Sequence, residues 1–266
     1  MRLSRLAMLA AGTLSFGACS SDTITTTTLP PLAGVRFINA LSDTGAVDIR
    51  MIDQVELSAV ANKLAFRDGT EHQPTEARAR HIRVFPNSFD QAITQKYMLD
   101  TTITLVADTR VTLLLTGSAR AKTVKFVVIT DSPPAVTAGQ IAVRAVNAAT
   151  GAIDAYVVTD TTVAIAAGTP LANVAPLATS VYVTRATGAA AIRVTDAGSA
   201  TVNISAPGPV SPALLAGELP AAGVNSAGTA FSVFYFPRAV AGSSAPQTAA
   251  FLKPGAIWFV DRVPLS

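Results

Sequence analysis

Charged, aromatic and metal-binding residues are scarce in this sequence of 266 residues. Only 14% of the residues are charged and 6% are aromatic, and the chain has one cysteine and two histidines. A single cysteine excludes an internal disulfide framework and a zinc site built on cysteines. Two histidines leave little material for metal or acid–base chemistry. The composition by itself therefore points to no specific activity.

Half of the sequence is hydrophobic, and this half is mostly Ala, Val, Ile and Leu, accompanied by 17 Gly and 16 Pro. Such a composition favours short strands and turns over long charged helices. The Ala-rich stretch 161–179 is interrupted by Gly168, Pro170 and Pro176, so we expect no long helix there. Alternating or β-branched runs predict strands at 35–39, 47–52, 81–85, 101–106, 111–116, 125–130, 141–146, 153–158, 180–184, 191–195, 231–236 and 257–260.

The N-terminus has the pattern of an export signal. Arg2 and Arg5 precede an apolar run at 6–16, and two small residues come directly before Cys19. The apolar run is shorter than the roughly 20 residues that span a bilayer. The Gly-Ala-Cys ending resembles the lipobox of bacterial lipoproteins, which implies a signal peptide at 1–18 and lipidation of Cys19. An ordinary secreted protein is the alternative.

Residues 19–33 look like a tether, because they are small, polar, rich in Thr and closed by Pro30 and Pro31. A folded module held at a membrane surface by an acyl chain needs such a spacer. Ser20 after the cysteine resembles the outer-membrane sorting pattern of some Gram-negative bacteria. We therefore expect a lipid-anchored protein of the bacterial cell envelope, on the periplasmic or surface face of the outer membrane.

The charge balance argues against nucleic-acid binding. The formal net charge is +3, and loss of Arg2 and Arg5 with the signal leaves 3 − 2 = +1. Residues 34–133 carry 12 Lys/Arg against 11 Asp/Glu, and residues 141–266 carry 6 against 5. Neither half has the excess of positive charge that phosphate neutralisation needs.

The chain contains an internal repeat. VRFINALSDTGAVDIRM at 35–51 aligns with VRAVNAATGAIDAYV at 143–157, about 108 residues further on. Each half also ends in an apolar strand that carries an Asp, in KFVVITDSPP at 125–134 and AIWFVDRVP at 256–264. The repeat predicts two tandem domains, at 34–134 and 140–266. Several short strands per domain predict Ig-like antiparallel β-sandwiches, and hence an all-β fold.

These segments resemble a known family. Val35 to Ala40, followed by Ser42-Asp43 and by Ala46 to Ile49, is similar to the opening of the DUF4397 module, and 143–156 resembles a second copy. Asn39 and Asn147 stand where the family usually has His. The resemblance implies tandem β-sandwich modules in an envelope or secreted protein, and it implies no catalytic residue.

The two histidines lie in the most charged stretch, 67–83. His72 and His81, with Glu71 and Glu76, are the candidates for a metal-dependent hydrolase of the periplasm. Their spacing does not fit a zincin helix, which needs two histidines four residues apart. We interpret the stretch as a solvated loop and expect no metal, cofactor or catalytic residue.

Asp48 and Asp154 recur in the two repeats, as do Arg36 and Arg144. We expect each Asp to cap a turn or to lie on the solvent face of its strand, and we expect Arg–Asp pairs across neighbouring strands. The aromatic residues of the second half are interpreted as core, with sugar stacking as the alternative: Phe231, Phe234, Tyr235, Phe236, Trp258 and Phe259.

The sequence therefore predicts a non-enzymatic envelope protein with a structural or recognition role. Its partners would be the membrane, through Cys19, and an envelope protein or polysaccharide. Two alternatives stay open: a hydrolase that uses His72 and His81, and a soluble secreted module that binds carbohydrate or protein.

Overall fold

The computed structural model describes residues 30–53, 59–213 and 221–264. The predicted signal peptide, Cys19 and most of the tether lie outside the described residues. Residues from Pro31 onward form one compact unit. No described helix is long and apolar enough to cross a membrane.

Strands β1 to β8 form sandwich 1 from two sheets. Its inner sheet has the order β4 (Gln73–Glu76), β1 (Leu32–Asn39), β7 (Arg110–Thr116) and β8 (Lys125–Thr130). Its outer sheet has the order β3 (Ala61–Leu64), β2 (Val47–Met51), β5 (Ala79–Pro86) and β6 (Leu99–Thr104), with the short helix α1 (Gln91–Thr94) between β5 and β6. Apolar side chains of both sheets share one core.

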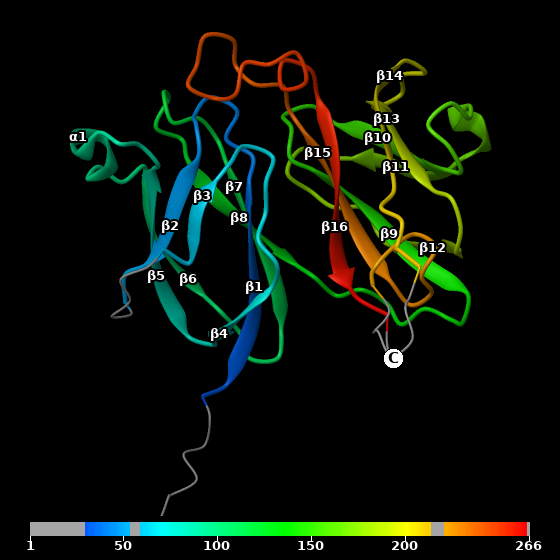
Figure 1. The fold of residues 1–266 in the computed structure, drawn as a ribbon, viewed down its shortest axis with the longest axis horizontal. Coiled ribbons are helices and arrows are strands. Elements are labelled where there is room, and N and C mark those ends of the chain that lie inside the picture. Colours follow the sequence, from blue (N-terminus) through cyan, green and yellow to red (C-terminus); the bar gives the residue numbers. More distant parts are fainter. Residues whose placement is uncertain (1–29, 54–58, 214–220, 265–266) are drawn as a thin grey trace, which may run out of the picture. The chain divides into compact units, whose positions relative to one another are not determined.

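Strands β9 to β16 form sandwich 2 in the same way (Figure 1). Its inner sheet has the order β12 (Val183–Ala186), β9 (Gln140–Asn147), β15 (Ala230–Phe236) and β16 (Gly255–Arg262). Its outer sheet has the order β11 (Thr169–Val174), β10 (Ile153–Val158), β13 (Ala191–Asp196) and β14 (Val202–Pro207), with the 3-10 turn η1 (Ile165–Ala167) before β11. Every strand of sandwich 1 thus has its equivalent eight strands later.

The predicted all-β fold with two sandwiches is confirmed, with one correction to the antiparallel pairing. In each inner sheet one pair is parallel: β1 with β7, and β9 with β15. The chain leaves β1 at one end of the inner sheet and enters β7 at the opposite end, so the two strands run in the same direction. Strand β8 ends at Thr130 and β9 begins at Gln140, so the connection between the sandwiches covers residues 131–139. The domain boundaries 34–134 and 140–266 stay predictions.

The inner sheets of the two sandwiches pack face to face. Ile38 and Leu114 of sandwich 1 share a buried cluster with Val146, Phe234 and Phe236 of sandwich 2. The central inner strands are therefore covered on both faces, which explains their nearly continuous apolar runs. The layers follow in the order outer, inner, inner and outer, and Arg36, Thr112 and Ser232 of the central inner strands lie between the sandwiches.

Candidate functional site

The side chain of Arg36 crosses from sandwich 1 into sandwich 2. Its Nε donates to Thr112 Oγ1 at 2.9 Å, on the neighbouring strand β7. Its Nη2 donates to Asp261 Oδ1 at 2.8 Å, and its Nη1 to the Val260 carbonyl at 3.2 Å, both on β16. Arg36 is only 1% exposed, so its charge is neutralised by the opposite sandwich rather than by water.

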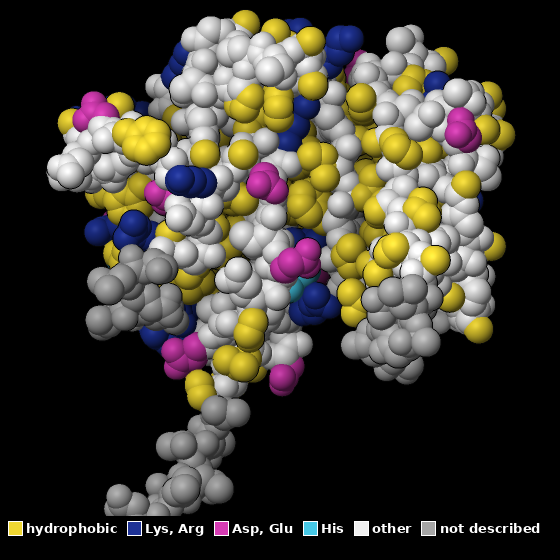
Figure 2. Space-filling model, in the orientation of Figure 1, with side chains coloured by type: hydrophobic (Ala, Val, Ile, Leu, Met, Phe, Trp, Pro, Cys, Tyr) yellow, Lys and Arg dark blue, Asp and Glu magenta, His cyan; other side chains and the backbone are white. Residues whose placement is uncertain are grey.

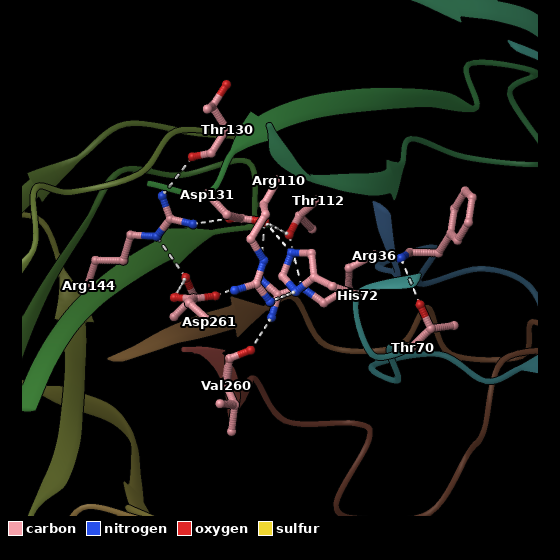
Figure 3. A network of polar contacts seen from close by, with 12 residues as sticks. Arg36, Thr70, His72, Arg110, Thr112, Thr130, Asp131, Arg144, Val260 and Asp261 are labelled. Carbon is pink, nitrogen blue, oxygen red and sulfur yellow. Dashed lines mark hydrogen bonds and ion pairs between the residues drawn. The ribbon is translucent and has the colours of Figure 1, made fainter. Parts of the chain in front are cut away.

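Arg144 makes the reciprocal crossing from sandwich 2 into sandwich 1 (Figure 3). Its Nε donates to Ser232 Oγ at 2.7 Å, its Nη2 to Asp131, and its Nη1 to the Thr130 carbonyl at 3.1 Å. Each hydrogen bond that Arg36 makes therefore has a counterpart made by Arg144 to the equivalent residue. Such mutual contacts are the mark of an interface with approximate two-fold symmetry.

The two carboxylates at the centre are fully engaged. Asp131 accepts from Thr112 Oγ1 at 2.6 Å and from His72 Nε2 at 2.9 Å, in addition to the bond from Arg144. Asp261 accepts from Ser232 Oγ at 2.6 Å and Tyr182 Oη at 2.8 Å, in addition to the bond from Arg36. We call this set the interface network: Arg36, His72, Thr112, Asp131, Arg144, Tyr182, Ser232 and Asp261.

The protonation states of the network follow from its contacts. Burial by itself would raise the pKa of Asp131, but the hydrogen bond from His72, the charge of Arg36 and the other donors hold that pKa below its usual value. Burial and the charge of Asp261 raise the pKa of the Tyr182 phenol, which stays a donor. Arg110 donates to His72 Nδ1 at 3.1 Å, so the Nε2 of His72 carries the hydrogen that Asp131 accepts.

Aromatic rings surround the two guanidinium groups. The guanidinium of Arg36 lies 5.6 Å from the ring centre of Phe259 and 5.9 Å from that of Phe234. Arg144 lies 4.7 Å from the ring centre of Tyr182. Phe231, Phe234 and Phe236 are buried, as their interpretation as core predicts.

A third arginine attaches the long loop 237–254, between β15 and β16, to sandwich 1. Arg67 donates to the carbonyls of Pro237 at 2.7 Å, Ala250 at 3.1 Å and Phe251 at 3.2 Å, and also to that of Lys253. Burial lowers its pKa to about 10, which still leaves the group charged at neutral pH. The loop also bonds Ser42 through the Val240 amide at 2.7 Å.

The candidate histidine site is not assembled. His72 belongs to the interface network, whereas His81 lies on β5 of the outer sheet and bonds Asp100, which also accepts from Arg83 at 2.7 Å. Glu76 accepts from Arg78 at 2.7 Å. Within the described ranges, no three His, Cys, Asp or Glu side chains are grouped as a metal site would require.

The two repeated aspartates do not cap the turn before their strands but bond the bulged backbone of the neighbouring outer strands β3 and β11. Asp48 accepts from the backbone N–H of Lys63 at 2.8 Å, and Asp154 from that of Asn173 at 2.6 Å. Lys63 and Asn173 have φ angles of 52° and 54°, beside a bulge in each outer sheet. Each carboxylate thus stabilises an unusual backbone conformation.

The expected Arg–Asp pairs across neighbouring strands need correction. Arg36 lies on the interface side of the inner sheet, whereas Asp48 belongs to the outer sheet of the same sandwich. The arginines pair with Asp131 and Asp261 of the opposite sandwich instead. The sequence contained a signal for these partners, since each repeat ends in an apolar strand with an Asp. Thr112 and Ser232 are hydroxyl residues in mainly apolar strands, and the sequence does not single them out.

Two hollows open between the sandwiches. One, of about 600 Å³, is mainly apolar and lies beside Phe251, Ile204 and Ile257. Figure 2 shows hydrophobic side chains gathered along the seam between the two halves on this face. The other, of about 580 Å³, is lined by residues of both sandwiches, among them several Ser and Thr residues and Lys125.

The fold and the network define a protein of two like β-sandwiches joined through their inner sheets. Residues 33–156 match the family model described as a domain of unknown function, DUF4397. The matched segment runs from β1 into β10 and so includes the first two strands of sandwich 2. The search of curated proteins returned no match.

Among solved structures, the chain is similar to the crystal structure of CBMbc, of family CBM26, from Eubacterium rectale Amy13K in complex with maltoheptaose. The identity is 11%, the match covers 76% of this chain and 91% of that chain, and the TM-score is 0.24. A likeness at this level carries no argument about function.

Proposed function

We propose that this protein is a lipid-anchored, non-enzymatic component of the bacterial cell envelope, in which two DUF4397-like sandwiches form one recognition unit. The observation that carries the proposal is the interface network. Its charged residues, which are the most buried charges between the sandwiches, bond one another and hold two modules together. The loops of both modules then form a joint surface at the end of the inner strands.

That sandwich 2 is a second copy of the module is supported by the repeated opening segments and by the equal strand order. The reciprocal roles of Arg36 and Arg144 add a third correspondence. The two copies would have kept the residues that join them and diverged in the loops, which is where binding specificity commonly lies.

Attachment through Cys19 is supported by the signal pattern, the lipobox-like ending and the tether. Ser20 after the cysteine supports the outer membrane as the destination. The test is expression of the full chain with radiolabelled palmitate, followed by membrane fractionation, beside a Cys19→Ala variant. We expect label and membrane retention for the wild type only; retention of the variant without label would contradict lipid anchoring.

The binding role is tested with the mature chain from residue 20 onward on an array of envelope polysaccharides. We expect saturable binding to at least one polysaccharide, with loss of binding in an Asp131→Ala variant that disrupts the joint surface. The exposed Asp100→Ala variant is the matched control and is expected to bind like the wild type. Absence of any saturable binding by the wild type, on the array and to purified envelope proteins, would contradict the recognition role.

A further inference from the structure

The approximate symmetry of the interface makes Arg67 and Leu177 equivalent. The amide of Arg67 donates to the carbonyl of Asn39 at 2.8 Å, and that of Leu177 donates to Asn147 at 2.9 Å. Both residues have positive φ angles, of 68° and 59°. The two side chains therefore leave the same backbone position on opposite sides of the interface.

On the side of Arg67 the guanidinium and the long loop 237–254 enter the cleft between the sandwiches, and what stays open there is the mainly apolar hollow of about 600 Å³. The guanidinium lies against Gly255, where a Cβ would come within 2.6 Å of Nη1, and the long loop supplies its carbonyl partners. On the other side Lys125 takes the place of Gly255, because Thr116 pairs with Lys125 as Phe236 pairs with Gly255. The turn between β7 and β8 is also short, so it does not reach across this cleft as the loop 237–254 does on the other side.

The cleft on the side of Leu177 and Lys125 is the hollow of about 580 Å³, and we call it the hydroxyl pocket. Its polar side chains are those of Ser42, Thr116, Ser118, Thr123, Lys125 and Thr150. Lys125 is the charged residue among those that line it, and no carboxylate of the described residues forms an ion pair with Lys125. The pocket thus offers one cation and several hydroxyl groups.

The carboxylate of Asp43, which bonds the pocket residue Ser118, is committed to the turn between β7 and β8. Asp43 accepts from Ser118 Oγ at 2.6 Å and from the amides of Ala119 and Arg120 at 3.1 Å each. Burial opposes its ionisation, but these bonds outweigh burial and hold the pKa of Asp43 below its usual value. The Asp43 carboxylate fixes the turn that carries Ser118 and does not compete for Lys125.

We propose that the hydroxyl pocket binds a sugar acid, an anionic and polyhydroxylated unit such as a hexuronate within a polysaccharide. The carboxylate of the ligand pairs with Lys125, and its hydroxyls exchange hydrogen bonds with the Ser and Thr side chains other than Ser118, whose hydroxyl bonds Asp43 and the Ala121 amide. A neutral sugar lacks the charge, and a simple carboxylate lacks the hydroxyls. This inference rests on the proposed recognition function and names the ligand class for it.

The test is calorimetric titration of the mature chain with D-glucuronate, D-glucose and acetate as probes. We expect saturable binding of glucuronate, at least tenfold tighter than that of glucose or acetate. Lys125→Gln is expected to weaken glucuronate at least tenfold, and Leu177→Arg, which introduces the equivalent of Arg67, to block the pocket. Lys122→Gln, on the same turn but outside the pocket, is the matched control and should bind like the wild type.

Absence of saturable glucuronate binding overturns the proposal, as does equal weakening by Lys122→Gln and Lys125→Gln. Glucose binding as tight as that of glucuronate overturns it too. Failure of the recognition function is distinguishable, because the array reports it separately. If a polysaccharide binds wild type and Lys125→Gln alike, the recognition function stands and the hydroxyl pocket is not its site.

Discussion

The two sandwiches have the same strand order, yet they differ in charge and in the lengths of several connecting loops. Residues 34–133 hold 12 + 11 = 23 charged side chains, whereas residues 141–266 hold 6 + 5 = 11. The β7–β8 connection covers residues 117–124, and the equivalent β15–β16 connection covers residues 237–254. What stays equal is the pair of cross-interface arginines and their carboxylates. The comparison separates residues that join the modules from residues that make their ends different.

Because the cross-interface contacts are the same in both sandwiches, removing the carboxylate from either sandwich should cost the same free energy of unfolding. Asp131→Ala and Asp261→Ala each leave a buried arginine without its carboxylate, which should lower the free energy of unfolding by about 3–5 kcal/mol. Urea unfolding of each variant beside the wild type measures it. A loss from one variant only, with the other unchanged, would show that the interface is not reciprocal in energy.

Because Arg67 is replaced by Leu177 at the equivalent position, only a substitution of Arg67 should release the loop 237–254. Arg67→Met keeps the apolar stem but removes the charged donor for several buried carbonyls, at a cost of about 2–3 kcal/mol. The loop 237–254 should then lose amide-exchange protection and become sensitive to limited proteolysis. Leu177→Ala, at the equivalent position, is the control and should leave the loop protected; an unchanged loop in Arg67→Met would refute the attachment.

Acid should weaken the interface through Asp131. Its pKa is lowered in the folded state, so its contribution to stability is present above the unfolded value of about 3.9 and is lost as the pH falls through the folded pKa. Unfolding by urea between pH 7 and pH 2 should show this loss. In Asp131→Asn the free energy of unfolding should depend less on pH in that range. An unchanged pH dependence would contradict the lowered pKa of Asp131.

The smallest effect is expected outside the interface. Asp100→Ala breaks the exposed contacts with His81 and Arg83 on the outer sheet, where water replaces the lost partners. Its unfolding midpoint should stay close to that of the wild type. If Asp100→Ala destabilised the protein as much as Asp131→Ala does, the exposed ion pairs would contribute as much to stability as the buried ones, which would contradict the account.

Local patterns in the sequence predict the central strands of all four sheets but not β3, β4, β11 and β14, each of which lies at the edge of its sheet. β1, β7, β9 and β15 are apolar and β-branched, and they were found. The short edge strands β3 and β4 read ANKL and QPTE, which lack an apolar period because they border the sheets. The parallel pairs could not be predicted, since periodicity reports the exposure of a strand and not the partner beside it.

Only those residues of the interface network that recur in both repeats could be predicted from the sequence. Arg36 and Arg144 stood out because they recur, and so did the strand-ending aspartates. Their pairing was not accessible, because Arg36 and Asp261 are 225 positions apart and belong to different modules. Arg67 has no counterpart in the repeat, where Leu177 stands, so no internal comparison could mark it.

The central claim is that reciprocal buried contacts join the two sandwiches into one unit. Differential scanning calorimetry of the mature chain tests it most directly. The account predicts one cooperative transition, with calorimetric and van't Hoff enthalpies in agreement, that moves to lower temperature in Asp131→Ala. Two separate transitions in the wild type, one for each sandwich, would contradict it.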